Sequence, residues 1–363
     1  MCKKRYAPMA QQGSIYSLST PAVLIDETIV DKNIMRVQNY MDQAGLKARP
    51  HIKTHKIPEF AKKQLAAGAI GITCQKISEA QIFADAGITD ILLTFNIMGA
   101  EKLDSLKALH EQITLSVVAD SRETVDGLAA TMDEKHPLRV MVECDTGGQR
   151  CGVQTPREAR DLAQYIADKP SLTFIGLMTY PMPNAEDDVE AFFEQTAGLL
   201  KEAGLECEVF STGGSPSLFS AERATIANEY RAGTYIYNDR SLVRAGHCGF
   251  DDCAMHILTT VVSRPTQDRA VLDAGSKALT SDLLGFADFG YVVDYPEAVI
   301  TGLSEEHAVV DLSACSKKPK IGEKIRIIPN HTCVVSNLMS HIYVHKSGVF
   351  DRKLDVAARG KVW

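Results

Sequence analysis

Residues 138–144 read LRVMVEC, and together with ITLSVVA before them (113–119) and TFIGLMT after them (173–179) they decide the fold class. Runs this apolar and rich in β-branched residues are typical of buried strands in a parallel sheet. In the longer stretches between such runs, apolar side chains recur at helical spacing, as Val189, Phe193 and Leu200 do. The alternation predicts repeated β-α units.

Working outward, strand-like runs continue in both directions and number eight: 49–53, 69–74, 90–95, 113–119, 138–144, 173–179, 207–211 and 229–233. Eight strands, each followed by a helix, predict a (β/α)8 barrel like that of TIM, which we place at residues 26–245. An open doubly wound sheet is the alternative. It normally carries a Gly-x-Gly-x-x-Gly or Walker loop after its first strand, and neither pattern occurs here.

Beyond residue 239 the helical periodicity largely stops, and short β-type runs follow at 255–262, 270–273, 290–294, 297–301, 308–312, 324–329 and 341–345. These runs predict a second, mostly antiparallel β domain. The extended segment 14–25 is expected to pair with it, so that residues 1–25 and 246–363 form one domain.

The composition excludes several classes of protein. The chain has 363 residues, with 39 Lys and Arg against 46 Asp and Glu and a net charge of -7, so no basic surface for nucleic acid is expected. No apolar run is long enough to cross a membrane, and no signal peptide precedes the first strand, so a cytoplasmic protein is predicted. The nine cysteines, Cys2 among them, include no Cys-x-x-Cys pair and are expected to be free thiols.

In a barrel, catalytic residues lie where strands end and loops begin. The first strand runs into RPHIKTHK (49–56). A lysine there, partly shielded from water and near other cations, would have its ammonium form disfavoured, which leaves an amine able to form a Schiff base. Lys53 and Lys56 are both candidates, and the alternative is that both are solvated loop lysines.

Two glycine-containing loops follow the seventh and eighth strands. The first is Thr212-Gly213-Gly214-Ser215, and the second, residues 231–235, ends at Tyr235. Glycines let backbone N–H groups turn inward and hydroxyls add donors, so these loops could bind a phosphate where barrels usually bind one. A plain tight turn explains the first loop as well.

Two further side chains lie at strand ends. Arg150 follows the fifth strand on a glycine-framed loop and suits an anionic oxygen, although a surface salt bridge would also explain it. Tyr180 ends the sixth strand and could stack on a planar ligand or belong to the core.

In the β domain, His331 and Cys333 are separated by one residue. In an extended segment they would face the same side and could bind one metal ion, with other coordination positions left open. A thiolate favours zinc over magnesium or manganese. A buried structural His and Cys is the alternative.

Taken together, these motifs, with Asp273-Ala274-Gly275-Ser276-Lys277, resemble the D-threonine aldolase and D-serine dehydratase family of pyridoxal phosphate enzymes, which has the alanine racemase fold. The resemblance covers residues 20–345. It implies that Lys53 carries the cofactor, that Arg150 meets its phenolic oxygen and Tyr180 its ring, and that the phosphate lies among a set of loop residues: Thr212, Gly213, Gly214, Ser215 and Tyr235. It also implies that His331 and Cys333 hold the metal ion, and that the protein is a homodimer.

The same resemblance implies a lyase acting on small D-β-hydroxy amino acids, of the D-threonine aldolase type. Dehydration of D-serine or D-3-hydroxyaspartate to a keto acid and ammonia is the alternative, and Cys333 resembles the zinc-dependent dehydratases. An amino-acid racemase or a non-catalytic cofactor carrier would share the barrel. One departure from the family is that no histidine follows Tyr180, where the chain reads PMPN (181–184).

Overall fold

The computed structural model describes residues 13–363, so Cys2 and the first twelve residues of the predicted β domain lie outside the described residues. The described chain divides into two compact units, one of residues 34–235 with 360–363, the other of residues 13–33 with 236–359. Helix α1 (Glu27–Gln43) begins in the second unit and continues into the first.

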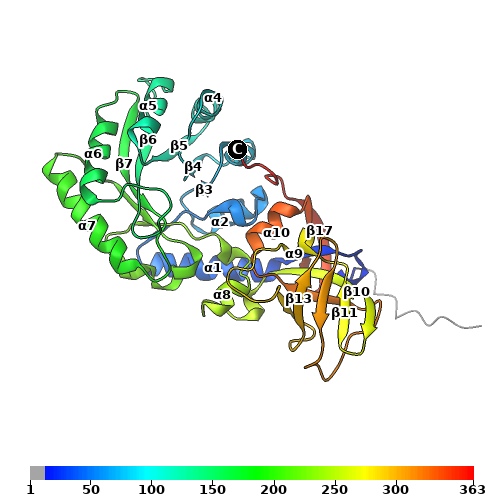
Figure 1. Ribbon diagram of the computed structural model, residues 1–363. Coiled ribbons are helices and arrows are strands. Elements are labelled where there is room, and N and C mark those ends of the chain that lie inside the picture. The colour runs from blue at the N-terminus through cyan, green and yellow to red at the C-terminus, as the bar shows by residue number, and fades with distance from the viewer. Residues whose placement is uncertain (1–12) are drawn as a thin grey trace, which may run out of the picture. The chain divides into compact units, whose positions relative to one another are not determined.

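The first unit contains one sheet of eight parallel strands (Figure 1): β2 (Lys47–Ala48), β3 (Ile72–Cys74), β4 (Asp90–Leu93), β5 (Thr114–Ala119), β6 (Leu138–Cys144), β7 (Leu172–Thr179), β8 (Val209–Thr212) and β9 (Glu229–Tyr230). The strand order from β2 through β9 and β8 to β3 brings the first two strands of the barrel to opposite ends of the sheet. Backbone N–H groups of Ile70 and Thr73 donate to the carbonyls of Ala48 and Pro50, at 3.0 and 2.9 Å, and join these ends. The predicted barrel is confirmed.

Helices alternate with the strands: α2 (Pro58–Ala67), α3 (Ile77–Asp85), α4 (Ala100–His110), α5 (Arg122–Thr131), α6 (Pro156–Ala167) and α7 (Glu186–Glu202). Helix α6 shows why such a segment folds locally. Thr155 and Glu158 form a capping box, Pro156 occupies the first turn, and Leu162 and Ile166 are buried. Inside the sheet, apolar side chains from neighbouring strands pack together: Leu92, Val118, Met141, Ile175 and Met178.

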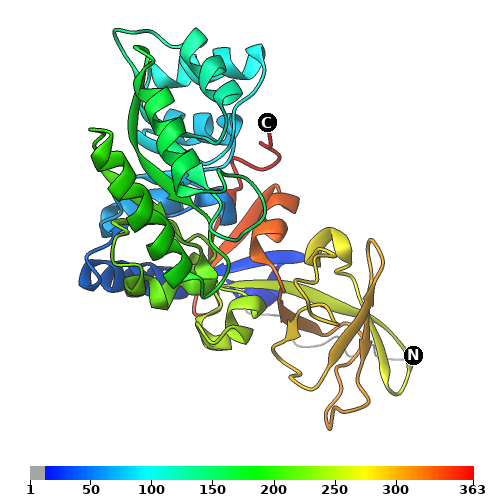
Figure 2. The same cartoon turned by 60° about the vertical axis from the view of Figure 1, so that its left-hand side comes forward.

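The second unit is a mostly antiparallel sheet: β1 (Ala22–Asp26), β10 (Met255–Thr266), β11 (Arg269–Leu272), β12 (Tyr291–Val292), β13 (Val299–Leu303), β14 (Ala308–Asp311), β15 (Lys324–Ile328), β16 (His341–Lys346) and β17 (Val349–Asp355). As predicted, the N-terminal segment returns to this sheet. Strand β1 pairs antiparallel with β10 and parallel with β16 (Figure 2).

Three short helices, α8 (Arg240–Arg244), α9 (Ser276–Leu279) and α10 (Thr332–Leu338), complete the second unit. Helices α9 and α10 and the strand β17 were not predicted from the sequence. Among residues 13–363, no helix has both the length and the apolar character that crossing a bilayer requires.

Candidate active site

Lys53 lies just past the end of the first barrel strand, as expected for a catalytic position. The predicted strand 49–53 is wrong in position, because β2 is Lys47–Ala48 and Lys53 sits in a single 3-10 turn, Ile52–Thr54. Its Nζ is 5.9 Å from the centroid of the Tyr180 ring.

Lys56, the other candidate, has a different environment. Its side chain is buried, and its Nζ lies 3.4 Å from Oε1 of Glu79, which is also buried. The Lys56 ammonium is therefore engaged by a buried ion-pair partner. The two candidates thus differ in their contacts: Lys56 Nζ lies against a buried carboxyl group, whereas Lys53 Nζ lies near an aromatic ring.

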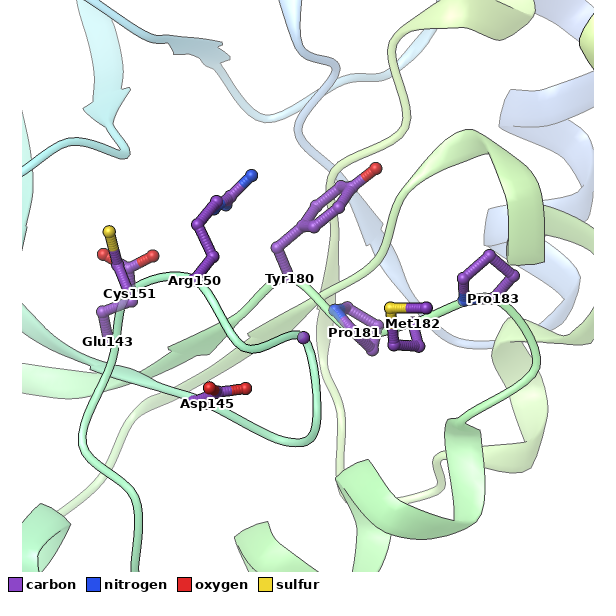
Figure 3. Close-up of a pocket in the computed structure, with 9 residues that line it drawn as sticks. Glu143, Asp145, Arg150, Cys151, Tyr180, Pro181, Met182 and Pro183 are labelled. Carbon is purple, nitrogen blue, oxygen red and sulfur yellow. The ribbon is translucent and has the colours of Figure 1, made fainter. Parts of the chain in front are cut away.

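Arg150 and Tyr180 lie together on the loops that follow β6 and β7. The Arg150 Cζ is 4.9 Å from the centroid of the Tyr180 ring, and both side chains line a pocket, projecting to the same side of their loops (Figure 3). Asp145 shapes the first loop, since its Oδ1 accepts the backbone N–H groups of Gly147 and Gln149 at 2.9 and 3.1 Å. Lys53 and Arg150 thus approach the same aromatic ring.

Glu143 is a buried carboxyl group at the end of β6 that lines the same pocket. Burial raises the pKa of Glu143 to about 7, although the nearby Arg150 lowers it. Asp120 and Cys151 offer ligand atoms within 4.8 Å of it, and these three form the one such group of three among the described residues. The sequence analysis did not single out Glu143, because nothing in its strand pattern marks it.

The two glycine-containing loops come together at the ends of β8 and β9. The Ser215 Oγ accepts the backbone N–H groups of Gly233 and Thr234, at 3.2 and 2.8 Å. Gly213 has a φ of +105°, and a Cβ there would lie 2.4 Å from the Tyr230 ring. A Cβ at Gly233 would lie 2.7 Å from the His51 carbonyl oxygen, so this position accepts only glycine without rearrangement.

Tyr180 also approaches this pair of loops, because a Cβ at Gly214 would lie 2.9 Å from the Tyr180 ring. Tyr235 differs from the other predicted phosphate residues. It is buried, and its hydroxyl accepts a hydrogen bond from Gln64 Nε2 at 2.9 Å. Thr212 ends β8 and is likewise buried.

Arg231, the first residue of the second glycine-containing loop, is a functional candidate whose role its motif did not predict. Its guanidinium is buried and donates to the Ser211 Oγ at 2.5 Å and to the Thr179 carbonyl at 2.6 Å. Burial lowers the pKa of Arg231 to about 10, against the raising effect of Glu229 and Glu143. A buried cation therefore lies among the strand ends below the glycine loops.

The predicted metal pair lies in the second unit, in a conformation that differs from the prediction. His331 and Cys333 do not share one face of an extended segment, because His331 is the N-cap of α10 and Cys333 lies in its first turn. The N-cap still has an extended backbone, with φ -141° and ψ 104°, whereas the next residues are helical. The two side chains nevertheless hydrogen-bond to each other.

Two carboxylates support the His331 segment. Asp282 Oδ2 is 2.6 Å from His331 Nδ1, and Asp239 Oδ2 accepts the backbone N–H and the hydroxyl of Thr332, at 3.2 and 3.4 Å. Burial alone would lower the pKa of His331, but Cys333 and Asp282 raise it to about 9. With the Asp282 carboxylate on Nδ1, Nε2 is the ring nitrogen that could serve as a metal ligand.

Comparison with known proteins matches both units. The alanine racemase N-terminal domain model matches residues 25–241, and the putative serine dehydratase domain model matches residues 254–345. D-threonine aldolase of Arthrobacter sp is 32% identical over 97% of this chain and 96% of its own length. D-threo-3-hydroxyaspartate dehydratase of Delftia sp. (strain HT23) is 33% identical over 89% of this chain and 93% of its own length.

Solved structures agree with this comparison. The crystal structure of D-threonine aldolase from Filomicrobium marinum has a TM-score of 0.90 at 30% identity and covers 98% of this chain and 100% of its own. The fold and these matches thus define an enzyme of the alanine racemase fold. Within it, the chain belongs to the family of pyridoxal phosphate-dependent lyases that includes D-threonine aldolase, D-threo-3-hydroxyaspartate dehydratase and D-serine dehydratase.

Proposed function

We propose that the chain is a lyase dependent on pyridoxal phosphate and a divalent metal ion, which cleaves D-threonine and related D-β-hydroxy amino acids to glycine and an aldehyde. The observation that carries this proposal is the approach of Lys53, Arg150 and the Gly214 loop to the single ring of Tyr180. An amine, a cation and a glycine loop around one aromatic ring suit a planar, anionic aldehyde cofactor.

The residues fit pyridoxal phosphate on this geometry. Lys53 offers the amine, and Gly213 and Gly233 lie too close to neighbouring atoms to carry a Cβ, so both loops need glycine at these positions. Glycine-containing loops of this kind suit an anionic phosphate. When bound, the cofactor supplies an electron sink for negative charge at the substrate Cα.

The side chains have distinct proposed roles. Lys53 holds the cofactor and moves a proton at its ε-nitrogen. Arg150 meets an anionic oxygen, and Tyr180 orients the ring. Thr212, Gly213, Gly214, Ser215 and Tyr235 form the phosphate end of the site.

For the metal ion, we propose His331 and Cys333 as ligands, with zinc favoured over manganese or magnesium because the set contains a thiol. A divalent ion there would supply Lewis acidity toward the substrate β-hydroxyl. In this proposal the barrel unit provides the cofactor site and the β unit the metal site.

A dehydratase is the second candidate, and one observation favours it. The solved structures of D-threo-3-hydroxyaspartate dehydratase include alanine variants of a histidine and of a cysteine two residues further on, the latter in the metal-free form. His331 and Cys333 have the same types and spacing. A dehydratase would release a keto acid and ammonia instead of glycine and an aldehyde.

Product analysis tests the proposal. Purified protein supplied with pyridoxal phosphate and Zn²⁺ is incubated with D-threonine, D-serine and D-threo-3-hydroxyaspartate in parallel. Glycine with acetaldehyde from D-threonine is the expected result. A keto acid with ammonia would identify the dehydratase. Formation of the L-isomer as the only product would identify a racemase and overturn both lyase assignments. A homodimer and a cytoplasmic location are further parts of the proposal.

A further inference from the structure

A continuous chain of polar contacts runs beside the Lys53 turn, through residues that the proposed chemistry does not use. Lys56 Nζ is 3.4 Å from Glu79 Oε1, and Glu79 Oε2 accepts the backbone N–H of Gln75 at 2.9 Å. The Gln75 Oε1 is 3.0 Å from His51 Nε2. The backbone N–H of Lys53 then donates to His51 Nδ1 at 3.3 Å, which links the chain to the Lys53 turn.

The partners in this chain assign the protons on His51. Gln75 Nε2 donates to the Thr94 carbonyl at 2.8 Å, which fixes the direction of the amide and leaves its oxygen facing His51. His51 Nε2 must therefore be the donor to Gln75. Because a backbone N–H can only donate, Nδ1 of His51 must be an unprotonated acceptor. The hydrogen bonds thus require a neutral imidazole with its proton on Nε2.

The surroundings of His51 oppose a positive charge on its ring. The side chain is buried, and burial, followed by the nearby charge of Lys53, lowers the pKa of His51 well below its ordinary value. Arg231 and His55 act in the same direction, whereas the hydrogen bond from His51 to Gln75 raises the pKa of His51.

Glu79 connects Lys56 to Gln75. Each of its oxygens has a different partner, Lys56 Nζ on one side and the Gln75 backbone on the other. Lys56 has a left-handed backbone, with φ 57°, at the end of the Lys53 turn. Such a conformation is uncommon outside glycine and persists where the surrounding structure holds it.

We propose that Gln75 and Glu79 are positioning residues for Lys53: they hold His51 as a neutral Nε2–H imidazole, whose Nδ1 fixes the backbone from which the Lys53 side chain leaves. Lys56 is the anchor of the same network rather than a second cofactor lysine. The inference rests on the proposed function in one respect, the role of Lys53.

The first test reads the proton assignment directly. Long-range ¹H–¹⁵N spectra of histidine-labelled protein, with His51 assigned by loss of its signals in His51→Gln, are recorded from pH 5 to pH 8. We expect the pattern of the neutral Nε2–H tautomer at every pH, with and without pyridoxal phosphate. A charged His51, or one with its proton on Nδ1, would overturn the proposal.

The second test changes one atom of the network. Gln75→Glu places a carboxylate against His51 Nε2, which favours a charged imidazole and removes the acceptor for the Lys53 N–H. The matched control is Gln81→Glu, the same change in α3, where Gln81 bonds to Asp85 and Gln112 outside the network. We expect Gln75→Glu to lower kcat by roughly 10²-fold with little change in KM. We also expect it to shift the pH profile of the bound-cofactor absorbance, whereas Gln81→Glu changes neither.

The two tests separate the failures. If the protein takes up no pyridoxal phosphate but shows the expected tautomer, the proposed function fails and the positioning role falls with it, while the network stands. If the cofactor binds and Gln75→Glu matches Gln81→Glu in kcat and in absorbance profile, the positioning proposal alone is wrong. Should Gln75→Glu not fold, the tautomer measurement on the unchanged protein still tests whether the network holds His51 neutral, and a charged or Nδ1–H imidazole there would overturn the proposal.

Discussion

The surroundings of Lys53 and of His331 differ in how they hold a reactive side chain. Lys53 belongs to a turn whose backbone is tied to a network of buried and half-buried groups from two segments of the barrel, residues 51–56 and 75–79. His331 caps a seven-residue helix and is oriented by one carboxylate, that of Asp282, in a half-exposed pair. A covalently held cofactor needs a fixed lysine, whereas a metal ion completes its own site once its ligands are close. The comparison therefore predicts large effects in the barrel and smaller ones around the proposed metal ligands, His331 and Cys333.

The largest expected effect is on activity in Lys53→Ala. Removing the amine removes both the cofactor attachment and a proton-transfer group, so turnover of D-threonine should fall on the order of 10³-fold or more. The exposed Lys62→Ala in α2 is the control and should keep full turnover and colour. Steady-state rates and absorption spectra measure both, and unchanged activity in Lys53→Ala would remove Lys53 from the site.

Breaking the buried ion pair comes next. Lys56→Met leaves Glu79 buried without its cation, which should lower the free energy of unfolding by about 3–5 kcal/mol. Lys169→Met breaks an exposed pair with Asp126 and should cost no more than about 1 kcal/mol. Urea unfolding of the two variants measures the difference. Equal losses of unfolding free energy would mean that the Lys56–Glu79 pair does not stabilise the barrel network.

The pH dependence of the unfolding free energy can be compared between the two units, because each contains a buried histidine with a lowered pKa. Burial lowers the pKa of His55 to about 4 in the barrel and that of His256 to about 3 in the β unit. The unfolded chain binds these protons more tightly than the folded protein does. The free energy of unfolding is therefore highest above about pH 6.5, and it falls as the pH drops toward the folded-state pKa of each histidine. For His55 this amounts to on the order of 3 kcal/mol. Unfolding free energies from pH 8 to pH 4 should show a shallower slope in His55→Gln and in His256→Gln, and a slope unchanged by both would contradict the burial argument.

The smallest effect is expected for the carboxylate beside His331. Asp282→Asn removes the charge that orients the imidazole and should weaken zinc binding by about 10- to 100-fold without abolishing it. Asp288→Asn is the control in the same loop, since Asp288 pairs with Arg240 at 2.7 Å. Competition with a chelating dye measures the affinity, and equal zinc affinities in the two variants would show that Asp282 does not orient the ligand.

Periodicity predicted most of the barrel because its strands are buried on both faces. The run 138–144 coincides with β6, and 173–179 differs from β7 by one residue. The first strand was predicted at the wrong residues, since β2 is Lys47–Ala48 and Ile52–Thr54 forms a 3-10 turn. Its apolar and β-branched residues resemble a strand, and the backbone direction there depends on contacts with His51, which spacing cannot reveal.

The candidate site was predictable only where a strand end marks it. Lys53, Arg150, Tyr180 and the Gly213 loop follow strands in sequence, so topology alone placed them. Gln75 and Glu79 escaped notice because their importance lies in partners distant along the chain. The helix at Thr332–Leu338 was missed because its Val-Val core resembles a strand, although His331 and Cys333 still meet at its start.

The central claim is that the barrel lysine at position 53 carries the cofactor. Protein loaded with pyridoxal phosphate, reduced with borohydride, digested and analysed by mass spectrometry reports the modified residue directly. We predict a single pyridoxyl group on Lys53. A label on Lys56, or no labelled peptide from a loaded and reduced sample, would contradict the account.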